Sequence, residues 1–303
     1  MKSSLYLFAL LLSVLSTSCE TTEKKQLELS KLFSDHMVLQ QNQEVAVWGA
    51  YTPGQTINLK GTWGAEVSVT SDASGLWETK LLSPAAGGPH QLEVITADST
   101  IVIEDILFGE VWLASGQSNM QMTLKGWPPN DPILNSAEEI SQANYPEIRM
   151  FTVARNMSIK PVDNIEGDWK TTSPETAGDF SASAYYFARR LHQELKVPIG
   201  IVHSSWGGTA AEAWTSSNTL RELGDFDEEL DAIDKPGVFD QVNQWFARWP
   251  SKEFPTTEEE WQNVDFSDTA VPQPGFDDSG WIPVELPGRV DLINEQTFDG
   301  AVW

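Results

Sequence analysis

Two short apolar runs, each followed at once by a turn rich in glycine and serine, constrain the fold of this chain more than any other feature. Residues 106–114 (ILFGEVWLA) precede the turn at 115–120 (SGQSNM), and residues 199–203 (IGIVH) precede the turn at 204–209 (SSWGGT). Runs of this length and character are typical of strands buried on both faces. Between them, residues 181–196 carry apolar side chains at helical spacing. This order of strand, turn, helix, strand and turn predicts an α/β layer with a parallel sheet.

The helix between the two runs has recognisable ends. Ser181 is the expected N-cap, because its hydroxyl can accept a hydrogen bond from a free backbone N–H in the first turn. Pro198 marks the other end, since the residue before a proline avoids helical geometry. In α/β sheets, ligands bind beyond the carboxyl ends of the strands, and both glycine-containing turns fall at that edge. We therefore expect the functional site at this edge of the sheet.

The regions on either side of this layer have a different pattern. Residues 28–105 contain short runs with strand-like alternation, separated by turn signals, which predicts a small β-sandwich. Residues 106–260 hold the α/β layer and end in an acidic stretch that we interpret as a solvated helical face. Residues 261–303 return to a β-like pattern interrupted by proline and glycine.

Charge and cysteine content exclude several classes of function. The chain has 303 residues, with 44 Asp and Glu against 19 Lys and Arg and a net charge of -25. Such acidity argues against binding of nucleic acids or anionic membranes, since both require basic side chains. A single Cys excludes an internal disulfide framework and a Cys-rich zinc site. The sequence also lacks an HExxH motif and the glycine motifs that bind nucleotides, so we expect no metal and no cofactor.

The first residues are typical of an export signal. Lys2 precedes an apolar run from Leu5 to Leu15, which is too short for a comfortable membrane span, so residues 1–19 are interpreted as a signal peptide. The single Cys, Cys19, follows small polar residues and resembles a bacterial lipoprotein cleavage site; an ordinary signal peptide that contains a Cys is the alternative. We expect an exported protein, periplasmic or at the cell surface, that contacts a membrane only through a lipid anchor at Cys19.

The first glycine-containing turn holds the sharpest candidate for catalysis, Ser118. A serine on a tight strand-to-helix turn has an exposed hydroxyl and a free backbone N–H, which suits a nucleophile whose own amide stabilises an oxyanion. In the second turn, Gly207 and Gly208 let backbone N–H groups approach a ligand closely and are candidates for a second donor. Each turn also has a simpler interpretation: a polar helix cap for the first, and a steric need for glycine for the second.

A serine hydrolase also needs a base, usually a histidine oriented by a carboxylate. The histidines of the chain are His36, His90, His192 and His203. Only His203 lies at the expected edge of the sheet, and it is a weak candidate because it precedes the glycine turn and can simply be packed inside. The residues alone therefore leave the base unassigned.

Several motifs, taken together and in order, resemble the sialate O-acetylesterase family, a branch of the SGNH (GDSL-like) esterases. Along the chain they are FSDHMVLQ at 33–40, VWG at 47–49, GEVW at 109–112, SGQSNM at 115–120, FSA at 180–182, AYYFA at 184–188, SSWGGT at 204–209, EAW at 212–214, PGFDDSGW at 274–281 and FDGAVW at 298–303. The resemblance covers residues 30–303. It implies a flavodoxin-like core with a parallel sheet, preceded by a β-domain and followed by the truncated start of an inserted galactose-binding-like jelly roll at 261–303.

The resemblance also implies roles for individual residues. Ser118 would be the nucleophile that attacks an acetyl carbonyl, with its own N–H and that of Gly207 or Gly208 as oxyanion donors. Gln117 and Asn119 would shape the turn or touch the substrate. In this family the Asp and His of the triad follow the jelly roll, so we expect them beyond residue 303 and expect this sequence to be the N-terminal part of a longer protein.

The implied activity is removal of O-acetyl groups from sialic acids or related glycans through an acetyl-Ser118 intermediate, with an O-acetylated carbohydrate as the partner. Another carbohydrate O-acetylesterase, such as one that acts on acetyl xylan, is an alternative, because the core motifs report ester chemistry and not the sugar. A second alternative is a non-catalytic carbohydrate-binding fragment with a degenerate esterase core, since the Asp and His of the triad are absent from this sequence.

Overall fold

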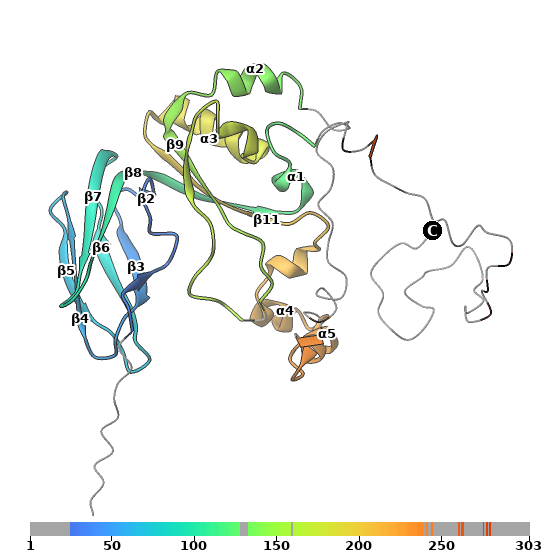
Figure 1. Ribbon diagram of the computed structural model, residues 1–303, viewed down its shortest axis with the longest axis horizontal. Helices are drawn as coiled ribbons and strands as arrows, with labels where there is room; N and C mark the ends of the chain where they lie inside the picture. The colour runs from blue at the N-terminus through green and yellow to red at the C-terminus, as the bar shows by residue number, and fades with distance from the viewer. Residues whose placement is uncertain are drawn as a thin grey trace, which may run out of the picture. The chain divides into compact units, whose positions relative to one another are not determined.

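The computed structural model describes residues 25–127, 133–158 and 160–238, and a few single positions after them (Figure 1). The chain divides into two compact units, and the described ranges belong to the first, Met1–Thr256. Within these ranges, no helix is both long enough and apolar enough to cross a bilayer.

Two of the predicted regions fall outside this description. The signal peptide at 1–19, with Cys19, lies outside the described residues, and so do all but a few single positions of the jelly roll at 261–303. Both therefore stay predictions.

The strands are β1 (Glu28–Leu29), β2 (Val38–Gln40), β3 (Glu44–Ala50), β4 (Thr56–Gly61), β5 (Glu66–Thr70), β6 (Leu76–Leu82), β7 (Gly87–Ile95), β8 (Thr100–Gly116), β9 (Tyr145–Thr152), β10 (Trp169–Thr172) and β11 (Ile199–Ser205). The helices are α1 (Ser118–Gln121), α2 (Ser136–Ser141), α3 (Ala182–Leu195), α4 (Ser217–Leu223) and α5 (Asp227–Ile233), with 3-10 turns at Ala177–Asp179 and Ala211–Trp214. The strand-like runs predicted near the N-terminus are thus strands, whereas β1, β2, β6, β9 and β10 were not predicted.

Strand β8 organises the larger sheet, whose order is β10-β9-β11-β8-β7-β4-β5, with β2 also paired to β8. The first part of β8 pairs antiparallel with β7, and the second part pairs parallel with β11, from Ile199 opposite Glu110 to Ser205 opposite Gly116. In Figure 1, β8 extends from the β-rich region to the helices. The domain boundary predicted after residue 105 therefore falls inside one continuous strand.

The second part of the sheet is a mixed α/β layer that contains parallel strands, as the sequence predicts. β11 lies between β8 and β9 and is parallel to both, while β10 pairs antiparallel with β9 at the edge. Helix α3 packs against β9 and β11. Its N-cap is Ser181, whose hydroxyl accepts a hydrogen bond from the backbone N–H of Ala184, and its C-cap is Lys196, in the left-handed conformation. These are the helix ends that the sequence predicts.

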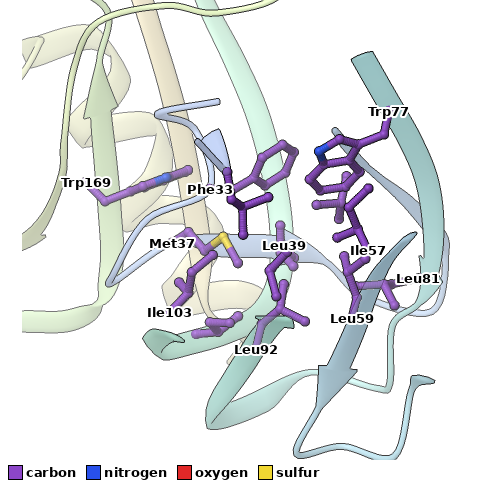
Figure 2. Close-up of a cluster of buried hydrophobic side chains, with 14 of the residues drawn as sticks. Phe33, Met37, Leu39, Ile57, Leu59, Trp77, Leu81, Leu92, Ile103 and Trp169 are labelled. Carbon is purple, nitrogen blue, oxygen red and sulfur yellow. The ribbon is translucent and has the colours of Figure 1, made fainter. Parts of the chain in front are cut away.

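The β-rich region has a core of large side chains. Strand alternation directs them inward; in β4, Ile57 and Leu59 are fully buried while Thr56 and Lys60 are exposed. The cluster joins side chains of the small β1-β3-β6 sheet to side chains of the larger sheet. Figure 2 labels Phe33, Met37, Leu39, Ile57, Leu59, Trp77, Leu81, Leu92, Ile103 and Trp169 of this cluster. The larger sheet continues past residue 105 into the α/β layer, so the structure does not separate residues 28–105 as a β-sandwich of their own. That β-sandwich therefore stays a prediction.

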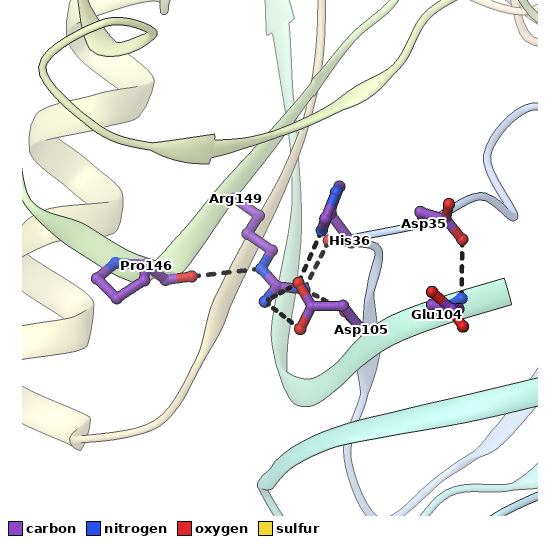
Figure 3. Close-up of polar contacts among 6 residues, drawn as sticks. All are labelled: Asp35, His36, Glu104, Asp105, Pro146 and Arg149. Carbon is purple, nitrogen blue, oxygen red and sulfur yellow. Dashed lines mark hydrogen bonds and ion pairs between the residues drawn. The ribbon is translucent and has the colours of Figure 1, made fainter.

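A buried arginine lies where β8 changes partners. The guanidinium of Arg149, on β9, donates to both carboxylate oxygens of Asp105 at 2.9 and 3.0 Å, and also to the backbone carbonyls of Asp105, His36 and Pro146 (Figure 3). The Nδ1 atom of His36 lies 2.7 Å from Asp105 Oδ2. Arg149 is only 4% exposed. Its hydrogen bonds therefore tie β9 to the middle of β8 and to the loop before β2.

Candidate active site

The turn that follows β8 presents Ser118 at the carboxyl end of the strand. β8 ends at Gly116, whose φ of 146° lies in the region that favours glycine. Gln117 is the N-cap of α1, and its carbonyl accepts from the backbone N–H groups of Met120 and Gln121 at 3.0 and 2.9 Å. Ser118 opens this short helix and is partly exposed. The turn therefore holds the serine at the open edge of the sheet, where Figure 1 shows α1.

The end of β11 reaches the same place because the two strands are parallel and in register. Ser205 lies opposite Gly116, and the Trp206 N–H donates to the Gly116 carbonyl at 3.0 Å, which extends the pairing by one residue. Gly207 follows, and a Cβ atom built on it would lie 3.5 Å from both Cα and Cβ of Ser118. The fold thus brings together the two turns that the sequence singles out.

Two glutamine side chains accept hydrogen bonds from the backbone N–H groups around Ser118. The Oε1 atom of Gln117 accepts from the Ser118 N–H at 3.1 Å and from the Ser118 hydroxyl at 2.8 Å. The Oε1 atom of Gln121 accepts from the Gly207 N–H at 2.5 Å. Each is a carbonyl oxygen, so it accepts the same kind of hydrogen bond that an acyl oxygen would accept. Sequence reasoning singled out Gln117 but missed Gln121, whose position depends on the register of β11 against β8.

The other predicted contacts, Gly208 and Asn119, directly follow Gly207 and Ser118 in the same two turns. Gly208 has a φ of 84°, and a Cβ atom built on it would meet nothing within 4 Å, so it lies on the open side of the bend. Asn119 is exposed, and its backbone carbonyl accepts from the Ser183 hydroxyl at 3.1 Å, which ties α1 to α3. Gly207 is therefore the glycine whose N–H faces the serine turn.

His203 is a packed histidine that joins β11 to α1. It is 6% exposed, and its Nε2 atom lies 3.1 Å from the Met120 carbonyl and 2.7 Å from Ser205 Oγ. Burial lowers the pKa of His203, and the hydrogen bond to Met120 opposes this shift only in part. Within the described part of the chain, its Nδ1 atom has no hydrogen-bond partner. The lowered pKa favours a neutral imidazole, which packs between β11 and α1. Its hydrogen-bond contacts are with Met120 and Ser205 and do not include Ser118.

Two histidines have a carboxylate partner, and both are far from the serine. His192 lies 3.8 Å from Glu147, and its Nδ1 atom contacts the carbonyl of Val197 before the start of β11, whereas Ser118 lies beside the end of β11. The second is His36, which pairs with Asp105. Asp105 lies in β8, and Ser118 follows 13 positions later. At roughly 3.3 Å per residue of strand, that separation is on the order of 30 Å or more. The described residues therefore place no histidine–carboxylate pair beside Ser118. They also hold no group of three or more His, Cys, Asp and Glu side chains that could bind a metal ion.

One cavity formed by described residues lies away from the serine. It has a volume of about 640 Å³ and lies over the small sheet, where Trp48, Leu76 and Trp77 line it together with Glu28 and Glu78. A large pocket is the usual first guess for a binding site. Here the chemistry points elsewhere, because the lining includes neither Ser118 nor the glycine bend.

The fold and the serine turn define a mixed α/β protein related to carbohydrate esterases. The crystal structure of a carbohydrate acetylesterase from Xanthomonas citri matches it with a TM-score of 0.60 and 37% sequence identity, covering 64% of this chain and 44% of that one.

Several curated relatives share one more specific name, sialate O-acetylesterase. Sialate O-acetylesterase from mouse is 34% identical over 229 residues, which is 69% of this chain and 41% of the mouse protein. The human enzyme is 34% identical over 212 residues, which is 63% of this chain and 39% of the human protein. The chain is therefore a homologue of the sialate O-acetylesterases and spans about two fifths of their length. No family model matches the chain.

Proposed function

We propose that the chain carries the nucleophile of a sialate O-acetylesterase-like serine esterase, which removes O-acetyl groups from sialic acids or related glycans. The observation that carries this proposal is the convergence of the Ser118 hydroxyl, the Ser118 N–H and the Gly207 N–H at the carboxyl edge of a parallel sheet. Homology to enzymes named for this activity supports it. The flavodoxin-like description of the core belongs to the same proposal.

The reaction follows from these groups. Ser118 Oγ attacks the acetyl carbonyl carbon while a base takes its proton, and the carbonyl oxygen becomes an oxyanion that accepts from the Ser118 and Gly207 N–H groups. The tetrahedral intermediate collapses, the C–O bond to the sugar breaks, and the sugar oxygen takes up the proton. Water then attacks acetyl-Ser118 by the same route and releases acetate. The base is proposed to be the His of an Asp–His pair, as the family resemblance implies.

The proposal includes a location and leaves the sugar open. The signal peptide and Cys19 would place the protein outside the cytoplasm, with a lipid anchor as its link to the membrane. The ester chemistry is equally compatible with acetyl xylan and other acetylated glycans, and the solved structure that this fold resembles is named as a carbohydrate acetylesterase. The sugar would be bound next to the serine turn, where Gln117 and Asn119 are exposed.

A second candidate function, carbohydrate binding without catalysis, is favoured by the cavity over the small sheet. Trp48 and Leu76 give it an apolar floor, and Glu28, Glu78 and Asn164 line it with hydrogen-bonding groups. Aromatic surface combined with carboxylate and amide groups is suited to a sugar, whose faces are apolar and whose edges carry hydroxyls.

Acetate release from a chromogenic acetyl ester and from O-acetylated sialic acid tests the esterase proposal. In the protein that also carries the proposed Asp–His pair, we expect Ser118→Ala to lower kcat/KM by at least about a thousandfold, because the nucleophile is lost. Ser115→Ala is the matched control, since Ser115 is exposed near the end of β8, and this variant should retain the rate of the parent protein. Equal rates for the parent and Ser118→Ala would refute the assignment.

Titration of xylo-oligosaccharide and sialyllactose into the Ser118→Ala variant distinguishes the carbohydrate-binding function from the esterase function. Binding that is lost in Glu78→Gln, with no Ser118-dependent hydrolysis in the parent, would favour the cavity as the functional site. Hydrolysis that depends on Ser118 and is unchanged in Glu78→Gln favours the esterase.

A further inference from the structure

We infer that Gln121 is a positioning residue that gates the acyl-oxygen site: in the free protein its side-chain amide oxygen occupies the Gly207 N–H, and the substrate must displace it. The inference rests on the proposed esterase function at Ser118 and adds to it a residue that sets how easily the substrate enters.

The geometry follows from the position of Gln121 in α1. It is the last residue of the helix, three positions after Ser118, so the two side chains lie on neighbouring parts of one helix face. Its Oε1 atom is 2.5 Å from the Gly207 nitrogen and would lie 2.9 Å from a Cβ atom built on Gly207. The amide oxygen thus lies against the glycine in the space that a side chain would otherwise fill.

The same contact decides what the N–H can do. A backbone N–H has one hydrogen, and a short, direct bond to Gln121 leaves it unable to donate a comparable bond to an acyl oxygen. The Ser118 N–H likewise already donates to a side-chain oxygen, because Gln117 Oε1 accepts from it. The free protein therefore holds both proposed oxyanion donors on glutamine oxygens. Gln117 also accepts from the Ser118 hydroxyl, so its removal would disturb the nucleophile. Among the described residues, the side chain of Gln121 accepts from the Gly207 N–H and makes no hydrogen bond to the Ser118 hydroxyl.

Two substitutions at Gln121 have opposite expected effects. Gln121→Met keeps the length and flexibility of the side chain and removes the acceptor, so the substrate oxygen no longer competes with it. We expect KM to fall about fivefold with kcat unchanged within about twofold, because a typical hydrogen bond is lost from the free protein alone. Gln121→Glu places a charged acceptor on the same N–H and repels the developing oxyanion, so we expect kcat/KM to fall at least about tenfold.

A matched pair of controls is available at Gln142. This residue follows α2, and its side-chain amide donates to Glu138 at 3.1 Å, away from the serine turn. Gln142→Met and Gln142→Glu make the same chemical changes and should leave KM and kcat unchanged. A role of Gln121 in stability alone would make both of its variants less active in parallel, which would overturn the inference.

Amide hydrogen exchange at Gly207, followed by NMR in the parent and in Ser118→Ala, gives a readout that needs no hydrolysis. We expect exchange of the Gly207 amide to be about tenfold faster in Gln121→Met and slower in Gln121→Glu. Unchanged exchange in Gln121→Met, or a higher KM in that variant, would overturn the gate and leave the role of Ser118 intact. Hydrolysis that does not depend on Ser118 would instead overturn the esterase proposal, and the exchange measurement would still decide whether Gln121 occupies Gly207.

Discussion

The two halves of β8 lie in very different surroundings. The first half packs Ile103 and Phe108 into a core of large side chains, against β7 and the small sheet. The second half ends at Gly116 beside β11, in a core that includes small residues such as Ala184 and Ala188 of α3. Small side chains let a helix pack closely on a sheet. One strand thus packs into a core of large side chains at its beginning and carries the candidate serine turn at its end.

A substitution where the two halves meet should give the largest loss of stability. A Cβ atom built on Gly109 would lie 1.9 Å from the carbonyl oxygen of Pro198, a backbone atom that cannot rotate away. Gly109→Ala must therefore push β11 from β8, and we expect it to lower the free energy of unfolding by about 3 kcal/mol. Urea unfolding measures this change.

The control for this substitution is Gly178→Ala, because a Cβ atom there would make only an ordinary contact of 3.6 Å with Ile140. Equal stability of the two variants would contradict the close packing of β8 on the segment before β11.

Removal of the buried guanidinium should have the next largest effect. Arg149→Met fills a similar volume but leaves the Asp105 carboxylate and several backbone carbonyls without their donor. Breaking a buried ion pair costs roughly 3–5 kcal/mol, and we expect about 2 kcal/mol here because the Asp105 side chain is 36% exposed. Thermal unfolding of Arg149→Met against Arg190→Met, an exposed arginine on α3, measures it. A loss no greater than that of Arg190→Met would show that the junction does not depend on Arg149.

The smallest expected effect is the pH dependence that Asp105 contributes. Burial alone would raise the pKa of Asp105, but hydrogen bonds from His36 and Arg149 and the charge of Arg149 outweigh it and hold that pKa below its usual value. The folded state therefore favours the carboxylate. Its stabilisation is fully present above about pH 4, the usual pKa of an unfolded aspartate, and is lost as pH falls through the lower folded pKa.

The difference between the parent and Asp105→Asn isolates this contribution from the many other carboxylates. We expect the unfolding midpoint of the parent to fall more steeply than that of Asp105→Asn between pH 4 and pH 2. Parallel curves would mean that Asp105 is not held as the carboxylate at the junction.

The sequence predicts those parts of the fold whose local pattern is strong. β11 and α3 were predicted because an apolar run and a helical period mark them, and Ser181 marks the start of the helix. β9 was missed because YPEIRMFT has a proline near its start and a charged residue, Arg149, at a buried position. That arginine is compatible with a buried strand only through Asp105, a partner from a different strand that no local pattern reveals.

In the candidate site, too, local sequence pattern predicts some residues and not others. Ser118 and Gly207 could be predicted because each lies in a recognisable turn after an apolar run. The first run was expected to be buried on both faces, but Trp112 and Leu113 near its end are exposed. Gln121 could not, since its contact with Gly207 needs the register that places Ser205 opposite Gly116. The one available signal is its spacing of three positions from Ser118, which places both side chains near each other on a helix.

The continuity of β8 also fixes an order of assembly during synthesis. β7 leaves the ribosome just before β8, so the first half of β8 meets a partner as soon as it emerges. The second half must wait for β11, whose end lies about 90 residues later, and at about 5–20 residues per second this is a delay of roughly 4 to 18 s. For that interval an apolar strand edge stays unpaired on the nascent chain. Chaperone capture of arrested chains should therefore be strongest for those that end between β8 and β11.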